Sequence, residues 1–357
     1  MRIVNLARQE RAPKTWVEAV PVYEFLISLC GFAEPEAWSS LELGQTWFER
    51  LAARTSHRFQ SALDQLGSSA GHMWLNLIPL IHQRGWSEVT AFVDSLARMP
   101  PMELRLHLLG YYIPESFVSL EPETVLAAAR GDPEAQRRLL ADRNYFEGTA
   151  RTLASFLSLD PPRTRRLTLD VLRRWNKEVF SDFEPEVMAA LERDAAAKRE
   201  MLTSMSPERV IEIATGVGFP PQAGGREVLM IPQLSLRPWL LTFEDGDVGL
   251  LCYPVADESL EGNEGAPPAR LLRLLKALSD ERRLRILRAL TKSSATLQEL
   301  SEQFGVPKTS LHYHLAVLRT TKLIRVSADP SRLYSLRRDV LPEVGLILER
   351  FLGEGEP

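Results

Sequence analysis

Residues 307–320, PKTSLHYHLAVLRT, gather hydrogen-bonding side chains on the first two turns of an apparent helix. Histidines, a tyrosine, hydroxyls and a lysine could bind a metal, form a catalytic cluster or read another molecule. His312 and His314 are two positions apart and therefore point to different helix faces, a poor geometry for one metal ion. We expect no metal site and no cofactor. We expect His312 to contact a base or a phosphate, and His314 to be half-buried.

The residues just before this stretch predict how it is presented. Thr296 and Glu299 have the spacing of a capping box at the start of a helix, LQELSEQF. Gly305 permits the left-handed backbone that ends that helix, and Pro307 presets the first turn of the next one. Two helices joined by a short turn containing glycine predict a helix-turn-helix motif. The buried face of its second helix has i, i+4, i+7 spacing and consists of Leu311, Leu315 and Leu318.

Two short segments of alternating polarity follow, LIRVS and RLYSL, on either side of Ala328-Asp329-Pro330-Ser331. They predict a basic β-hairpin directly after the second helix, the position of a wing. A helix-turn-helix pattern alone is a weak signal. The capping box, glycine turn, polar-fronted helix and basic hairpin in this order predict a winged helix domain.

Two earlier helices are expected to complete this domain. Ser279 is the expected N-cap of the second one, with acidic residues favourable in its first turn. The first helix has one apolar face, made of Leu271, Leu274, Leu275 and Leu278. The second has a stripe that we expect to be buried, made of Leu284, Leu287 and Leu290.

A winged helix of this kind reads DNA through the N-terminal end of its second motif helix. Lysine donates to guanine or phosphate, and hydroxyl and imidazole groups can donate or accept at base edges. The predicted contacts from this helix are Lys308, Thr309, Ser310, His312, Tyr313 and Arg319. The hairpin is expected to reach the DNA backbone or the minor groove through Arg325 and Arg332.

Charge is distributed unevenly along the 357 residues, although the formal net charge is only -4. Residues 270–339 contain 15 Lys and Arg against 6 Asp and Glu, whereas residues 1–269 contain 27 against 37. A basic block beside an acidic one indicates that only the last part of the chain meets a polyanion.

The stretch ALSDERRLRILRALTKSSATLQELSEQFGVPKTSLHYHLAVLRTTKLIRV resembles the winged-helix domain of the ArsR family of bacterial repressors. The resemblance covers roughly residues 267–340, and His312-Tyr313-His314-Leu315 stand at the family's serine and histidine positions. It implies a homodimer with paired outer helices, a palindromic DNA operator, and repression relieved by a signal. Residues 341–353, LPEVGLILERFLG, would form the terminal dimerisation helix.

The sequence departs from the metal-sensing members of that family. Their Cys-x-Cys pattern is missing from ATLQELSEQF, and the last helix offers only Glu343 and Glu349 as candidate ligands. Metal sensing is therefore not expected. The long region before the winged helix resembles the helical extension of some ArsR-like regulators, which carries an R-P-W segment such as Arg237-Pro238-Trp239.

The pattern along the chain predicts a mainly α protein with a short antiparallel β segment and a C-terminal winged helix-turn-helix domain. Prolines punctuate a helical regulatory domain at residues 1–215, with breaks expected at Pro100-Pro101, Pro161-Pro162 and Pro185. Residues 216–256 read as antiparallel strands with a turn at Asp245-Gly246. Residues 257–268 read as a linker, and residues 269–357 as the DNA-binding domain with its dimerisation helix.

Other candidate sites in the N-terminal region have simpler interpretations. Cys30 is expected to be a small buried apolar residue rather than a redox switch. Core packing is the first interpretation of four tryptophans, with a ligand pocket as the alternative: Trp38, Trp47, Trp74 and Trp86. We find no catalytic constellation in the sequence, and so expect no enzyme.

We expect a cytoplasmic protein, because the sequence shows neither a signal peptide nor an apolar run of about 20 residues. The expected function is transcriptional regulation, through repression, by a homodimer that binds double-stranded DNA. Its N-terminal domain is expected to modulate DNA binding in response to an unknown signal, through a small-molecule effector, a protein partner or extra dimer surface. Two alternatives remain: an enzyme with a fused winged helix, and a winged helix that binds an acidic protein partner.

Overall fold

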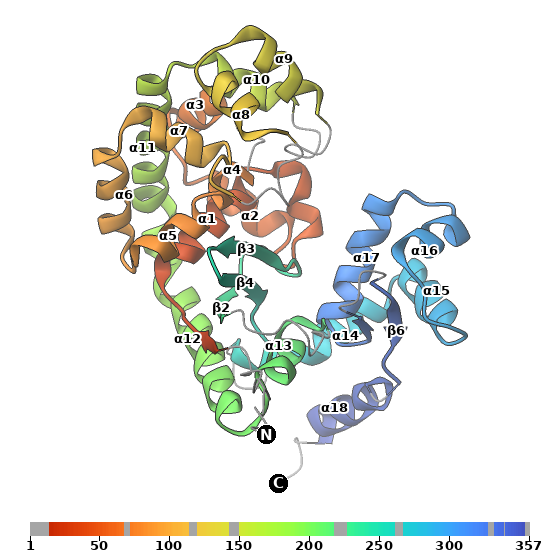
Figure 1. Cartoon of the computed structure of the whole chain (residues 1–357). Coiled ribbons are helices and arrows are strands. Elements are labelled where there is room, and N and C mark those ends of the chain that lie inside the picture. The colour runs from red at the N-terminus through yellow and green to blue at the C-terminus, as the bar shows by residue number, and fades with distance from the viewer. Residues whose placement is uncertain are drawn as a thin grey trace, which may run out of the picture.

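A computed structural model describes residues 14–67, 72–113, 120–142, 150–217, 227–260, 267–327, 332–338 and 340–353. Figure 1 shows a large helical body, coloured red to green, and a smaller blue C-terminal domain beside it. A small sheet lies on the side of the body that faces the C-terminal domain. Within the described ranges, no helix has both the length and the apolar character needed to cross a bilayer.

Proline begins many helices of the body, because its fixed φ suits the first turn and its missing N–H is not needed there. Pro101 and Pro161 stand at two of the predicted breaks and start α7 and α11. The first helical elements are α1 (Pro21–Phe32), η1 (Pro35–Ser40), α2 (Gln45–Ala52), α3 (His57–Leu66), α4 (His72–Leu75), α5 (Ile78–Arg84), α6 (Val89–Arg98) and α7 (Pro101–Leu108). The later ones are α8 (Pro122–Ala129), α9 (Pro133–Ala141), α10 (Ala150–Ser158), α11 (Pro161–Trp175), η4 (Asn176–Phe180), α12 (Ser181–Ser204) and α13 (Pro207–Thr215).

The break expected at Pro185 is wrong. Pro185 lies inside α12, which continues to Ser204. The carbonyl that its missing N–H would have bonded belongs to Ser181, the first residue of the helix, so little is lost. The π-helical turn η4 comes just before.

The sheet is mixed, which corrects the expectation of a purely antiparallel segment. Its order is β1 (Thr15–Val17), β2 (Glu227–Gln233), β4 (Val248–Pro254) and β3 (Leu241–Asp245). The turn at Asp245-Gly246 joins the antiparallel pair β3 and β4, as predicted. However, β4 pairs parallel with β2, and β2 pairs parallel with β1 from the start of the chain.

Sheet and helices share one core. Leu229, Ile231 and Leu250 are buried in the same apolar cluster as α1, α3 and α11. Trp38 and Trp74 belong to that cluster, and Trp47 and Trp86 pack against it, which confirms the core interpretation of the four tryptophans. Cys30 is also buried there, as predicted.

The C-terminal domain has its own apolar core, centred on Ile286, Leu300, Leu311, Leu315 and Leu318. It confirms the predicted winged helix-turn-helix architecture. Its helices are α14 (Ala269–Leu278), α15 (Glu281–Leu290), α16 (Leu297–Phe304), α17 (Lys308–Thr320) and α18 (Leu341–Gly353). Its hairpin consists of β5 (Ile324–Val326) and β6 (Tyr334–Leu336). A short helical turn, η5 (Asp257–Ser259), precedes the domain.

Candidate DNA-binding interface

The turn between α16 and α17 sets the direction of the second helix. The capping box is complete, since the Thr296 hydroxyl accepts from the Glu299 N–H and the Glu299 carboxylate accepts from the Thr296 N–H. Gly305 ends α16 in the left-handed conformation, with φ of 63°. Because the leucines of α17 are buried in the domain core, its polar face points outward.

The N-terminal end of α17 is open. Lys308, Thr309 and Ser310 are exposed in its first turn, as predicted. Pro307 is the N-cap, and its side chain cannot accept a hydrogen bond from the first N–H groups of the helix. Free N–H groups and the positive end of the helix dipole together favour an anion such as phosphate.

The hairpin presents two arginines beside this helix. Arg325 is exposed on β5, opposite Ser335, and its Nε donates to the Ser335 hydroxyl at 3.1 Å. Arg332 is exposed just before β6, with φ of 45°. This left-handed conformation is uncommon for a residue with a side chain, and such residues cluster at functional sites.

A family model described as a helix-turn-helix domain matches residues 278–327, the segment from the end of α14 through β5. The C-terminal region is an ArsR-type DNA-binding domain. A relative, the HTH-type transcriptional regulator KmtR of Mycobacterium tuberculosis, is 31% identical over 64 residues, which are 18% of this chain. The chain spans about half (49%) of that relative's length. No solved structure matches the chain.

His314 packs inside the ArsR-type domain. It is half-buried, as predicted, with its Nδ1 3.8 Å from the carboxylate of Asp280. Burial lowers the pKa of His314, although Asp280 acts in the opposite direction. Asp280 also caps α15 by accepting from the Arg283 N–H at 2.9 Å. Asp280, rather than the predicted Ser279, is therefore the N-cap, and His314 of α17 lies close to this end of α15.

The expectation that Arg319 is exposed for DNA is wrong. Its side chain is buried, because the body packs onto the end of α17. The guanidinium donates to the carbonyl of Thr215 and to that of Pro238, at 3.2 Å for the latter. Gly216 makes this approach possible: with φ of 68°, its missing Cβ would lie 2.9 Å from Cγ of Arg319. Arg319 thus fastens the ArsR-type domain to the body.

A second contact covers the middle of α17. The ring of Trp239, between β2 and β3, stacks on His312 at 5.3 Å between centroids and 23° between planes. His312 is exposed and is one of the predicted DNA contacts. In the structure, however, one face of its ring lies against Trp239 of the body. Helical spacing did not predict the contact between Trp239 and α17. The R-P-W segment contains Trp239, but the resemblance assigned no role to it.

The body also contacts the wing. The N–H of Val326 on β5 donates to the carbonyl of Gly216 at 3.3 Å, and Val217 pairs with Val326 as an isolated parallel bridge. Among the predicted DNA contacts on α17, those in the first turn of the helix therefore remain accessible. The body lies against His312, Arg319 and the start of the hairpin.

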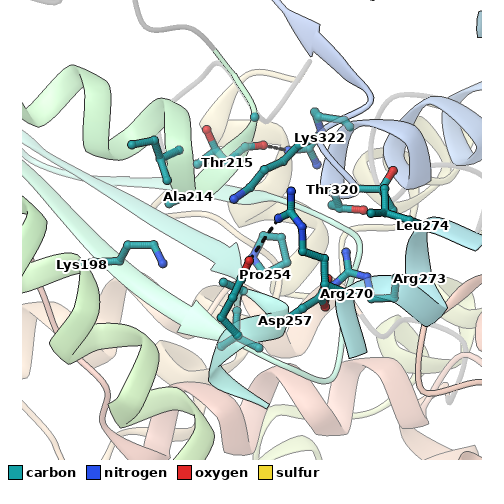
Figure 2. Close-up of a pocket in the computed structure, with 17 residues that line it drawn as sticks. Lys198, Ala214, Thr215, Pro254, Asp257, Arg270, Arg273, Leu274, Thr320 and Lys322 are labelled. Carbon is teal, nitrogen blue, oxygen red and sulfur yellow. Dashed lines mark hydrogen bonds and ion pairs between the residues drawn. The ribbon is translucent and has the colours of Figure 1, made fainter. Parts of the chain in front are cut away.

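Ion pairs join the body to α14. Asp257 of η5 contacts both Arg237 of the body, at 2.7 Å, and Arg273 of α14. Glu42 contacts the same two arginines at 3.2 and 3.4 Å. Burial raises the pKa of Asp257 to about 6, with Arg237 opposing the shift. Figure 2 shows Asp257, Arg270 and Arg273 near Lys322. These residues line a small cavity of about 30 Å³.

Neither the contacts of α17 and the wing with the body nor the ion pairs at α14 resemble a metal centre. Among the residues that the structure describes, no group of three or more His, Cys, Asp or Glu could hold a metal ion. The exposed first turn of α17 and the hairpin with its two arginines have a clear chemical use. They are suited to recognise a polyanion that presents base edges.

Proposed function

We propose that this protein is a cytoplasmic, sequence-specific transcriptional repressor that binds a palindromic operator as a homodimer and is controlled through its N-terminal body. One observation carries the proposal: Lys308, Thr309 and Ser310 are exposed on an uncapped helix N-terminus, beside two exposed wing arginines. The helix end can enter a major groove while the wing reaches the neighbouring backbone.

Apolar side chains left exposed on the outer helices support the homodimer. Leu272 and Leu275 on α14 are each 41% exposed, and Leu346 and Leu352 on α18 are 62% and 69% exposed. Leu275 belongs to the predicted apolar face of its helix, and pairing with a second copy would explain why it is exposed here. The contacts between α14 and α18 place both helices on one side of the domain.

Replacing Leu346 by glutamate tests this pairing. We expect the wild-type chain to sediment as a dimer and Leu346→Glu to shift it toward the monomer, because a charge would be buried in an apolar interface. The measurement is sedimentation equilibrium over a range of protein concentrations. Met205→Glu, a change at a 43% exposed side chain on the body, is the matched control and should remain dimeric. A wild-type monomer at all concentrations would contradict the pairing.

Control through the body is supported by its contacts with α17. The stack of Trp239 on His312 and the anchoring of Arg319 cover surface that a DNA groove would need. Operator binding must then release these contacts, so the packed arrangement competes with DNA.

Removing the stack is expected to strengthen DNA binding. Aromatic pairs contribute roughly 0.5–1.5 kcal/mol beyond area burial, so Trp239→Ala should raise operator affinity by about 2- to 10-fold. Fluorescence anisotropy with labelled operator measures the change. Tyr112→Ala, at a 51% exposed aromatic residue of the body, is the matched control and should leave affinity unchanged. Weaker binding by Trp239→Ala would mean that the ring helps rather than hinders DNA recognition.

We further propose that the chain acts by binding, without a catalytic step. Among the described residues of the body, the two fully buried carboxylates already have structural partners. Glu24 accepts from the N–H groups of Leu234 and Ser235 and from the Ser235 hydroxyl. Asp194 accepts from the Tyr253 hydroxyl at 2.8 Å and the Ala256 N–H at 2.8 Å. Both therefore stabilise the body's loops.

DNA binding by the purified full-length chain tests the function. The probe is the DNA upstream of its own coding sequence, titrated at low and at physiological salt. We expect selective binding that weakens steeply with salt, since phosphate contacts release counterions. Absence of selective binding by both wild type and Trp239→Ala would favour a winged helix that serves an acidic protein partner.

A further inference from the structure

A cavity of about 500 Å³ lies where the sheet of the body meets α17 and the wing. Its sheet wall includes Trp239, Thr242 and Leu251. Its other wall comes from the ArsR-type domain and includes His312, Ala316, Arg319, Val326, Arg332 and Tyr334. The space therefore lies between two domains with separate apolar cores, and the residues of its two walls are more than 50 positions apart in the sequence.

The lining of the cavity combines aromatic and aliphatic surface with positive charge. Trp239 and Tyr334 supply ring surface, and Leu251 and Val326 supply aliphatic surface. The charged side chains of the described lining are Arg319 and Arg332, and no aspartate or glutamate is among them. Apolar pockets with a few placed polar groups are typical of small-molecule sites. Here the charge selects an anion.

Arg319 provides an independent reason to expect an anion. The side chain is 7% exposed and donates to two carbonyls, but within the described residues it makes no ion pair with a carboxylate. Arg237 is 2% exposed and is paired with both Glu42 and Asp257. Burial lowers the pKa of Arg319 to about 10. A buried cation without a counter-ion is costly, and a bound carboxylate would offset that cost.

We propose that this cavity binds a planar aromatic carboxylate, with the carboxylate at Arg319 and Arg332 and the ring against Trp239 and Tyr334. The regulatory part of the inference rests on the proposed function. Guanidinium groups bind carboxylates in a forked geometry, and they also stack on aromatic planes.

The position of the ligand determines its effect on DNA binding. It contacts the sheet and α17 together, so it binds best to the packed arrangement and stabilises it. His312 and Arg332 then face the ligand and cannot contact DNA at the same time. Linkage is reciprocal, so ligand weakens operator binding and operator weakens ligand binding by the same factor. The ligand would therefore act as an effector that releases the repressor from its operator.

Calorimetric titration of the full-length chain tests the site without DNA. The probes are benzoate, 1-naphthoate, the neutral 1-naphthamide and acetate. We expect saturable binding of at least one aromatic carboxylate, and binding of naphthamide and acetate at least about tenfold weaker, because each lacks either the charge or the ring. If neither aromatic carboxylate binds at millimolar concentration, or if naphthamide binds as well as naphthoate, the assignment is overturned.

Two variants locate the binding. Thr242→Trp places a large ring in the cavity from an exposed position on β3 without replacing a predicted DNA contact, and should abolish carboxylate binding. Thr203→Trp, at an exposed threonine of α12, is its matched control. Arg319→Gln should weaken binding by about tenfold or more, if the variant folds. Binding that survives Thr242→Trp would place the ligand elsewhere and overturn the inference.

A DNA arm separates this inference from the proposed function. We expect the bound carboxylate to lower operator affinity of the wild type but not of Thr242→Trp. Carboxylate binding that leaves operator affinity unchanged would overturn the coupling while DNA recognition stands. A protein that binds the carboxylate at this cavity but never binds DNA selectively would refute the proposed function while the site stands.

Discussion

Lys308→Ala is expected to weaken operator binding by about 1–3 kcal/mol, or roughly 5- to 150-fold. Lys308 is the first residue of α17, where the residues of a recognition helix meet base edges. Its side chain is exposed, so the substitution removes a cationic donor without disturbing the core. The measurement is fluorescence anisotropy on operator DNA and on the same DNA with single base-pair changes. Discrimination should relax at one base pair if the ammonium reads a guanine.

The matched control is Lys177→Ala, which removes an exposed lysine from the η4 turn of the body. It should bind operator like the wild type. A uniform loss over all sequences by Lys308→Ala, with a shallower salt dependence, would assign this lysine to a phosphate. Equal affinities of Lys308→Ala and wild type would contradict the docking of α17 in the groove.

Asp194→Ala is expected to lower the free energy of unfolding of the body by about 3–5 kcal/mol, because it removes one partner of a buried ion pair and leaves several donors unpaired. Asp194 is fully buried on α12 and pairs with Lys198 at 3.2 Å. It also accepts from Tyr253 on β4 and from Ala256 and Ser259 beyond it. The change therefore removes hydrogen bonds that join α12 to the sheet and to η5.

Urea unfolding followed by tryptophan fluorescence is well suited to this measurement. All seven tryptophans precede residue 240, so the signal reports the body and not the winged helix domain. Asp182→Ala is the matched control on the same helix, because its exposed pair with Arg54 should contribute at most about 1 kcal/mol. Similar losses in the two variants would mean that the Asp194 network contributes little.

The C-terminal domain could be predicted closely because its signals are local. A capping box, a glycine turn and a leucine repeat each act within one helix or turn, and the structure contains all three. The exposure of Lys308, Thr309 and Ser310 follows from the same helical periodicity. Helical spacing misplaced Leu284, which is 47% exposed while Ile286 is buried.

Contacts between distant segments could not be predicted in this way. Period-two patterns do not state which strand is the neighbour, so the parallel pairing of β2 with β4 was missed. The position of Arg319 on α17 predicts an outward side chain, and only the packing of Gly216 and Pro238 against the helix end buries it. The stack of Trp239 on His312 likewise joins segments more than 70 residues apart.

The parallel pairing of β1 with β2 also affects the order in which the chain folds during synthesis. Thr15 finds its partner at Val228, and β2 in turn needs β4, so the sheet cannot be completed until residue 254 has left the ribosome. Such distant contacts are intrinsically slow to form. The winged helix domain emerges after the body and depends on a separate core. We therefore expect α17 to emerge beside a body that is already able to pack against it, so that newly made protein begins in the packed arrangement that we propose competes with DNA.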